Sequence, residues 1–234
     1  MKPALSEVHH AHVLIAFHQL LLEQAGERRG REIFMAATQA YGARRGRRMA
    51  LRALRDGNPL DMASYFAYGE LLSTPGAYVG TYTAVAGQVH EQQVQCPWAQ
   101  VFHQQGGQAC GVDYCKEIDL AIICGFNPNL DFLCTQNMHT APSCDFFYGG
   151  PEIQADFLET FPQRLPQGAQ VKRDMTFHTA DVYDSFCRTV GQVLPQAGDL
   201  IDQVRETLKA RFGPEFLDLL DSFPPESFEE ITPS

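Results

Sequence analysis

A change of hydrophobic period near Tyr78 restricts this chain to folds that combine helices with a β-sheet. Upstream of it, apolar side chains recur at helical spacing, whereas residues 78–85 and 89–95 are rich in β-branched and aromatic residues and flank the turn dipeptide Ala86-Gly87. These two segments predict a β-hairpin. Residues 130–138 and 144–148 also read as strands. We therefore expect an antiparallel sheet of about four strands between residues 78 and 150, with helices inserted between its hairpins.

Helical patterns on both sides of this sheet place the protein in the α+β class. Ser6 is a suitable N-cap for a helix over 6–24, and a second helix over 31–55 ends at Asp56-Gly57-Asn58-Pro59, where Gly favours a left-handed cap and Pro prevents continuation. A strand is expected at 170–178. The remaining expected helices cover 61–72, 97–102, 114–124 with Gly125 as its cap, 181–193, 199–212 and 214–222. Because 234 residues are near the upper limit for one hydrophobic core, we expect a core α+β domain over residues 1–150 and a helical C-terminal extension over 151–234 packed on it.

Hydropathy and cysteine usage indicate the compartment. No run approaches the roughly 18 to 20 apolar residues of a membrane span, and residues 1–10 lack the pattern of a secretory signal. We therefore expect a cytoplasmic protein that does not enter a membrane. Its seven cysteines are an odd number and occur without a disulfide-dense scaffold. They are expected to be thiols, and clustered thiols indicate metal binding or catalysis, although any one of them can equally be a small core residue.

The formal net charge of -10 conceals an uneven distribution, with +6 on residues 1–55 and -16 on residues 56–234. The two parts are expected to attract each other. Arg44, Arg48 and Arg55 share one sector of the second helix, with Arg52 beside it. This stripe is either an exposed face that pairs with acids elsewhere or a binding surface for a substrate carboxylate, for which Arg48 is the candidate. The acidic chain and the lack of interleaved aromatic residues argue against nucleic-acid binding, and a homo-oligomer stays open.

Four histidines, His9, His10, His12 and His18, lie on or near the first helix. His9 and His12 are three residues apart and could share a face as two metal ligands would. No carboxylate or Cys accompanies them at ligand spacing, so solvated helix histidines are the favoured interpretation.

Four short motifs, taken in order, resemble the signature of the L-2-amino-thiazoline-4-carboxylic acid hydrolase family. The motifs are Cys96-Pro97-Trp98, Tyr114-Cys115-Lys116-Glu117-Ile118-Asp119, Gly125-Phe126-Asn127-Pro128-Asn129-Leu130 and Ser143-Cys144-Asp145-Phe146. The Gly- and Arg-rich segment 41–48 is similar to the upstream helix of that family, so the resemblance spans about residues 30–150. Ahead of the last motif, His139 stands where family members often carry a Gly. The four remaining cysteines, Cys110, Cys124, Cys134 and Cys187, match no family position and are interpreted as core or incidental residues.

The resemblance implies a hydrolase that opens a carbon–nitrogen bond of a small cyclic isothiourea or amidine, such as L-2-amino-thiazoline-4-carboxylate, giving S-carbamoyl-cysteine. An amidine carbon is a poor electrophile, so the site must activate water or supply a thiolate, and must protonate the departing nitrogen. In one arrangement Cys96, Cys115 and Cys144 hold a divalent metal such as zinc with a bound water, and Asp119, one helical turn from Cys115, transfers protons. In the other, Cys115 is the nucleophile, and His139, His90 or His103 lowers its pKa.

Two further residues have both a structural and a functional interpretation. Asn127 suits a turn after a helix end, but its amide could bind substrate. Trp98 suits the core, but it could line a substrate pocket. The earlier cysteines and the late Cys-x-Phe are also similar to ligand-binding domains of the 4-vinyl reductase type, which implies a small-molecule sensor with a structural metal as the alternative function. Three protein ligands plus water would favour hydrolysis, and four protein ligands would favour sensing.

Overall fold

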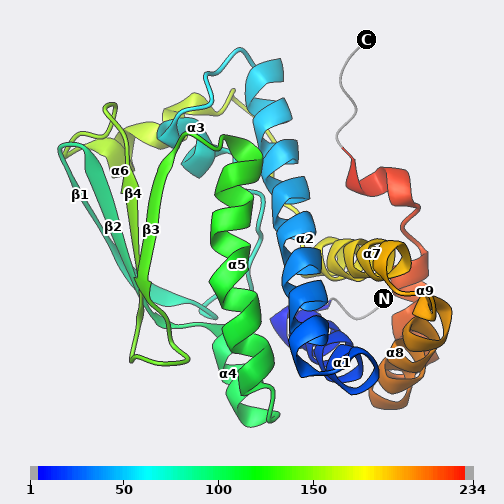
Figure 1. Ribbon diagram of the computed structural model, residues 1–234. Helices are drawn as coiled ribbons and strands as arrows, with labels where there is room; N and C mark the ends of the chain where they lie inside the picture. The colour runs from blue at the N-terminus through cyan, green and yellow to red at the C-terminus, as the bar shows by residue number, and fades with distance from the viewer. Residues whose placement is uncertain (1–4, 230–234) are drawn as a thin grey trace.

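The architecture is a four-stranded sheet beside a layer of helices (Figure 1), described for residues 5–229 by a computed structural model. In chain order, the elements are α1 (Glu7–Ala25), α2 (Glu27–Arg55), α3 (Met62–Ala67), β1 (Val79–Val85), β2 (Gln88–Gln95), α4 (Pro97–Gln104), α5 (Gln108–Phe126), β3 (Asp131–Gln136), β4 (Cys144–Gly149), α6 (Phe157–Thr160), the 3₁₀ turn η1 (Phe161–Arg164), α7 (Met175–Val193), α8 (Ala197–Phe212), α9 (Pro214–Asp221) and η2 (Pro225–Phe228). This confirms the α+β class.

The sheet has the strand order β1-β2-β4-β3, and every neighbouring pair is antiparallel. Paired residues share a face, so Tyr82, Glu91, Phe146 and Cys134 lie in one row across it. This face points toward the helices, because Tyr148, two residues along β4, packs in one cluster with the α3 and α5 side chains. The predicted hairpins and the helices inserted between them are therefore confirmed.

Helices α2 and α5 run side by side between the sheet and the group formed by α1, α7, α8 and α9 (Figure 1). Their backbones approach closely because glycines occupy the contact: a Cβ added to Gly42 would lie 2.6 Å from the Cβ of Ala121, and one added to Gly125 would lie 2.6 Å from the Cα of Ala43. Gly125 was expected to cap α5. That expectation is wrong, because the helix continues to Phe126 and Gly125 serves the helix–helix contact instead.

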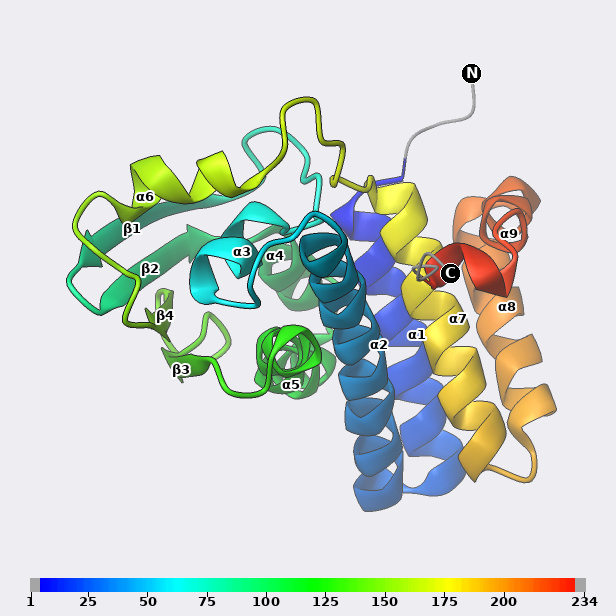
Figure 2. The ribbon, with the colours of Figure 1, turned by 90° about the horizontal axis from the view of Figure 1, so that it is seen from above.

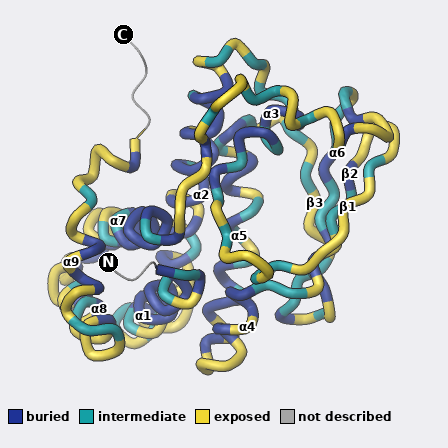
Figure 3. The backbone as a smooth tube through the Cα atoms, turned by 180° about the vertical axis from the view of Figure 1, so that it is seen from behind, coloured by how far each residue is buried: buried dark blue, intermediate teal, exposed yellow. Residues whose placement is uncertain are grey.

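The main hydrophobic core lies among α1, α2 and α7, with α8 and α9 on the outside (Figure 2). Burial follows the same arrangement in Figure 3, where the buried residues concentrate in these helices and the strands carry many exposed ones. A second cluster around Met62, Ile123 and Tyr148 joins the sheet to α3, α5 and α6. None of the helices within residues 5–229 combines the length and apolar character needed to cross a bilayer.

The strand expected at 170–178 is wrong. The Asp174 side chain accepts a hydrogen bond from the Phe177 backbone N–H at 3.0 Å, so Asp174 is an N-cap and α7 starts at Met175. Only a single bridge, between Leu71 and Arg173, has β character there. The N-cap signal outweighs the β-branched residues of this segment.

The expectation of solvated histidines on α1 is wrong for three of the four. His10, His12 and His18 are at most 6% exposed, because α1 packs against several helices and keeps little solvent face. His10 accepts a hydrogen bond from the Trp98 indole N–H at 3.0 Å, and His18 contacts the Asp113 carboxylate at 3.0 Å. His10 and His18 therefore join α1 to α4 and to α5.

The arginine stripe on α2 pairs with acids from later in the chain, as the charge distribution predicted. Arg44, Arg48 and Arg52 are buried rather than exposed, whereas Arg55 at the end of α2 is exposed. Arg48 donates to Glu70 at 2.6 Å and to Asp181 at 2.7 Å, and Arg52 donates to Glu70 at 3.1 Å. Arg44 pairs with Asp181 and with Asp184. These ion pairs join α2 to α7 and to the segment that follows α3.

Candidate active site

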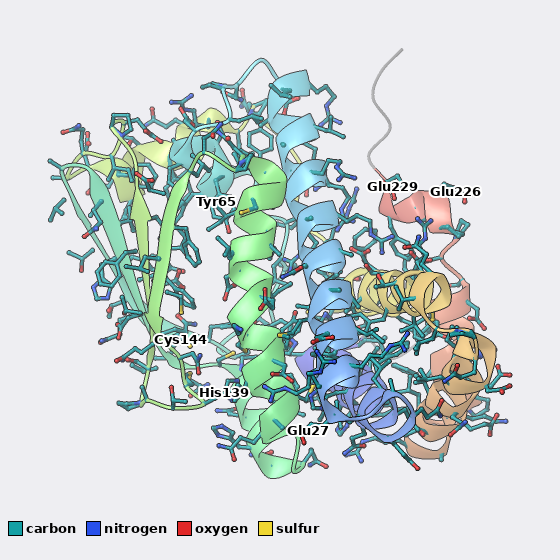
Figure 4. The ribbon with its side chains drawn as sticks, viewed as in Figure 1. Glu27, Tyr65, His139, Cys144, Glu226 and Glu229 are labelled. Carbon is teal, nitrogen blue, oxygen red and sulfur yellow. The ribbon has the colours of Figure 1, made fainter. Side chains whose placement is uncertain are left out.

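A thiol and an imidazole meet between α5 and the β3–β4 connection. The Nε2 atom of His139 lies 3.3 Å from the Sγ atom of Cys115, and the His139 backbone N–H donates to the Asn137 side chain at 3.0 Å. Gly111, one helical turn before Cys115, makes room for the imidazole, because a Cβ at this position would collide with the ring. Figure 4 shows His139 and Cys144 near the same end of α5.

Burial keeps both members of this pair neutral. It raises the pKa of the Cys115 thiol well above its ordinary value, and the neighbouring Cys96, Asp119 and Cys144 raise it further. Burial also lowers the pKa of His139 to about 4, to which His103 adds repulsion. At neutral pH a thiol therefore faces an unprotonated imidazole, which can accept its hydrogen bond.

Asp119 lies one helical turn beyond Cys115 and acts on its thiol, and the carboxyl group of Glu91 in turn acts on Asp119. Burial, followed by the charge of Glu91, raises the pKa of Asp119 to about 7. Burial also raises the pKa of Glu91, whose oxygens accept hydrogen bonds from Tyr82 at 2.7 Å and from Tyr148 at 2.9 Å. Asp119 comes from α5 and Glu91 from the helix-facing side of β2, so the two acids approach from opposite layers. Paired, desolvated carboxyls of this kind suit the binding of a cationic group.

The three thiols predicted to gather do influence one another. Burial raises the pKa of Cys96 and that of Cys144 to about 11 each, and neighbouring acidic groups contribute to both increases. Cys144 also accepts a hydrogen bond from the Met138 backbone N–H at 3.4 Å. Across residues 5–229, however, no three His, Cys, Asp or Glu side chains are placed so that they could hold one metal ion. The residues present therefore do not fit a prearranged metal centre.

The structure gives the predicted binding residues other partners. Asn127 ends α5, donates to the Leu60 carbonyl at 2.7 Å and accepts from the Asn129 N–H at 3.0 Å, which is the turn role. Trp98 is 9% exposed and donates to His10. Arg48 donates to Glu70, Asp181 and the Phe228 carbonyl, all within the helical layer.

Of the histidines considered beside Cys115, only His139 touches the thiol. His90 lies on the opposite face of the sheet, where it contacts Asp145 at 3.1 Å and stacks on Phe147. The ring centroid of His103 lies 5.4 Å from that of His139. His103 therefore affects the site through His139.

Sequence reasoning missed Glu91 and Arg45. Glu91 interrupts an otherwise uncharged alternation with Val89 and Gln93 on the helix-facing side of β2, and an acid at such a position is a signal that could have been used. Arg45 lies outside the arginine stripe that contains Arg48. Its direction follows only from the packing of α2 against α5.

Comparison with known proteins adds one finding. A sequence model of the family described as L-2-amino-thiazoline-4-carboxylic acid hydrolase matches residues 6–148. This stretch contains Cys115, Asp119, His139 and Glu91. No curated protein and no solved structure shows a significant match.

Proposed function

The chain belongs to the L-2-amino-thiazoline-4-carboxylic acid hydrolase family, and on that basis we propose that it opens a carbon–nitrogen bond of a small cyclic isothiourea or amidine with Cys115 as nucleophile. L-2-Amino-thiazoline-4-carboxylate, hydrolysed to S-carbamoyl-cysteine, is the substrate that the family description suggests. The observation that carries the proposal is the 3.3 Å contact between Cys115 Sγ and His139 Nε2.

The first half of the reaction forms a covalent adduct. The Cys115 proton passes to His139 Nε2 as Sγ adds to the amidine carbon, so the high thiol pKa is overcome only when a cationic substrate lies beside the sulfur. The electron pair of the ring C–N bond then moves to the ring nitrogen. His139 returns its proton to that nitrogen, which leaves as an amine. For the aminothiazoline a dithiocarbonimidate remains, in which one carbon carries Cys115 Sγ, the substrate sulfur and the exocyclic nitrogen.

The second half regenerates the thiol. Water adds to the same carbon while His139 takes one of its protons, and the C–Sγ bond breaks with its electron pair returning to Cys115. The sulfur recovers a proton from His139, and the second water proton is lost as the carbonyl group forms. One water is consumed overall, and the enzyme is unchanged.

Substrate binding is assigned to the two acids. An amidine is a delocalised cation, and Asp119 and Glu91 offer carboxylate oxygens to its N–H groups in a desolvated site, where charge-assisted hydrogen bonds are strong. Bringing a cation between them favours the ionised form of both acids. Binding therefore lowers the pKa of Asp119 from about 7.

The test compares Cys115→Ala and His139→Gln with the matched control Cys124→Ala, an exposed thiol on the same helix. We expect Cys115→Ala to abolish turnover of L-2-amino-thiazoline-4-carboxylate, His139→Gln to lower kcat by about 100- to 10,000-fold, and the control to be unaffected. Rapid-quench intact-mass spectrometry should detect a Cys115 adduct in the wild type. Full turnover by Cys115→Ala would refute the proposal.

Metal analysis of protein purified without added metal separates the nucleophile from the metal arrangement. Stoichiometric zinc that is lost together with activity in Cys96→Ala and Cys144→Ala would replace the nucleophilic mechanism with metal-activated water. Tight binding of the ring compound without turnover would instead favour the sensor function. We expect neither result.

A further inference from the structure

Arg45 differs from Arg44, Arg48 and Arg52, the other buried arginines of α2, because its guanidinium makes no hydrogen bond to a protein acceptor within residues 5–229. The residue is 9% exposed, and its guanidinium lies over the Tyr41 ring, 5.5 Å from the centroid. Its Nε atom lies 3.5 Å from Glu70 and makes no hydrogen bond. Arg48 donates to the same Glu70 at 2.6 Å and 3.2 Å. A desolvated guanidinium without close acceptors is costly, so Arg45 has capacity to bind an anion.

The position of Arg45 on α2 places it beside α5. Gly42 and Gly46, one helical turn apart, form the close contact with α5, and Arg45 flanks that contact on the same side of α2. A Cβ on Gly42 would lie 3.1 Å from the carbonyl oxygen of Ile118, the residue before Asp119. Arg45 and Asp119 therefore start from adjoining points of two touching helices.

The electrostatic influence of Arg45 extends into the candidate active site. Its charge lowers the pKa of Asp119, opposing the burial and the Glu91 carboxylate that raise it. It acts in the same direction on Tyr65, whose pKa is raised by burial and by Asp119, and on Tyr114, the neighbour of Cys115. The positive group and the two acids thus share one desolvated region.

We propose that Arg45 binds the carboxylate of the substrate, and that the site takes a zwitterion whose cationic amidine is held by Asp119 and Glu91. This assignment rests on the proposed function, and it moves carboxylate recognition from Arg48 to Arg45. A guanidinium offers two parallel N–H donors to a carboxylate, and in Arg45 the donors are not committed to protein acceptors. Arg45 is thereby the residue that selects an amidine acid over an amidine without the acid group.

The kinetic test uses two substrates, L-2-amino-thiazoline-4-carboxylate and 2-amino-2-thiazoline, which is the same ring without the carboxylate. We expect Arg45→Met to lower kcat/KM for the acid by about 10- to 100-fold, mainly through KM, and to lower that for the bare ring by a clearly smaller factor, because loss of the Arg45 charge also raises the pKa of Asp119. For the acid, the kcat/KM of Arg45→Lys should lie between that of the wild type and that of Arg45→Met. The matched control Arg47→Met removes the same charge from an exposed position of α2 and should leave both substrates unaffected.

Turnover of the bare ring also reports whether Arg45→Met has folded. If Arg45→Met does not fold, the two substrates are compared in Arg45→Lys instead. Equal losses on both substrates in Arg45→Lys and Arg45→Met would overturn the assignment.

A binding measurement separates this assignment from the hydrolysis itself. Equilibrium dialysis with Cys115→Ser protein compares the acid with its carboxamide, which has lost the negative charge. We expect the acid to bind at least about tenfold more tightly, and Arg45→Met in that background to remove the difference. The wild type could show no hydrolysis and still bind the acid more tightly than the carboxamide through Arg45. That result would refute the proposed function and support the carboxylate site. If acid and carboxamide bind equally, or neither binds, the carboxylate site fails whatever the turnover.

Discussion

Replacing Glu70 by Gln should destabilise the protein by an amount that depends on pH. Glu70 is 1% exposed and accepts hydrogen bonds from Arg48 and from Arg52. Burial alone would raise its pKa, but the charges of Arg48 and its neighbours prevail and hold it at about 2, against an ordinary value of 4.5. Gln keeps the size of the side chain and removes the charge.

The magnitude follows from this pKa difference. About 2.5 pKa units at 1.36 kcal/mol each correspond to about 3 kcal/mol of folding free energy. Because the pKa is lower in the folded state, this contribution is complete above about pH 4.5 and is lost as the pH falls through about 2. We therefore expect Glu70→Gln to cost about 3 kcal/mol at pH 7 and less than half of that at pH 3.

Urea unfolding at pH 7, 5 and 3, followed by the fluorescence of the single tryptophan, measures this difference. The matched control Glu32→Gln removes an exposed acid that pairs with Arg28 four residues earlier, and it should cost about 0.5 kcal/mol or less at each pH. A Glu70→Gln cost that stays below about 1 kcal/mol at pH 7, or that is the same at pH 3, would refute the reasoning.

Three other changes should have measurable results. Burial and a neighbouring carboxylate raise the pKa of Asp119 to about 7, so kcat/KM for a cationic amidine should rise with pH through that value. Asp119→Asn should remove this rise from the pH–rate profile. An unchanged profile in the variant would contradict the role given to Asp119. Gly46→Ala should lower the free energy of unfolding in urea by about 1 to 3 kcal/mol, because its Cβ would collide with the α5 backbone. Gly191 has open space around it, so Gly191→Ala should stabilise α7 by up to about 1 kcal/mol. A stabilising Gly46→Ala together with a destabilising Gly191→Ala would be incompatible with the packing. Asp174→Ala should cost about 1 kcal/mol and lower Tm by about 2 to 4 °C, because α7 loses its N-cap, and an unchanged Tm would show that the cap contributes nothing.

Local patterns predicted the elements well where each residue interacts mainly with its sequence neighbours. The hairpin over β1 and β2, the start of α4 at Pro97 and the end of α2 before Gly57, whose φ is +78°, follow from turn and cap chemistry within a few residues. The strand expected at 170–178 failed although the deciding signal is also local, because the Asp174 side chain caps α7 within three residues.

Predictions about burial failed where a second element decides the outcome. Several His and Arg side chains of α1 and α2 look like solvent-facing residues in sequence, yet partners far along the chain bury them. His18 meets Asp113, and Arg48 meets Asp181. Because a buried charge is stable only when a partner reaches it, the sequence of one helix cannot show whether its charged face is exposed.

The candidate site shows the same division. Cys115 and Asp119 were predicted from one helix because their spacing is a local property, and the family resemblance rested on motifs that can be read along the chain. The sequence alone thus determined the α+β class, the four-stranded sheet and the segment that carries the thiols. Only the tertiary structure brought His139 to Cys115, placed Glu91 opposite Asp119 and left Arg45 without close acceptors. Those three placements depend on how the sheet and α2 pack against α5, and contacts across such distances in the chain are set by the packing of whole elements rather than by the pattern of any one of them.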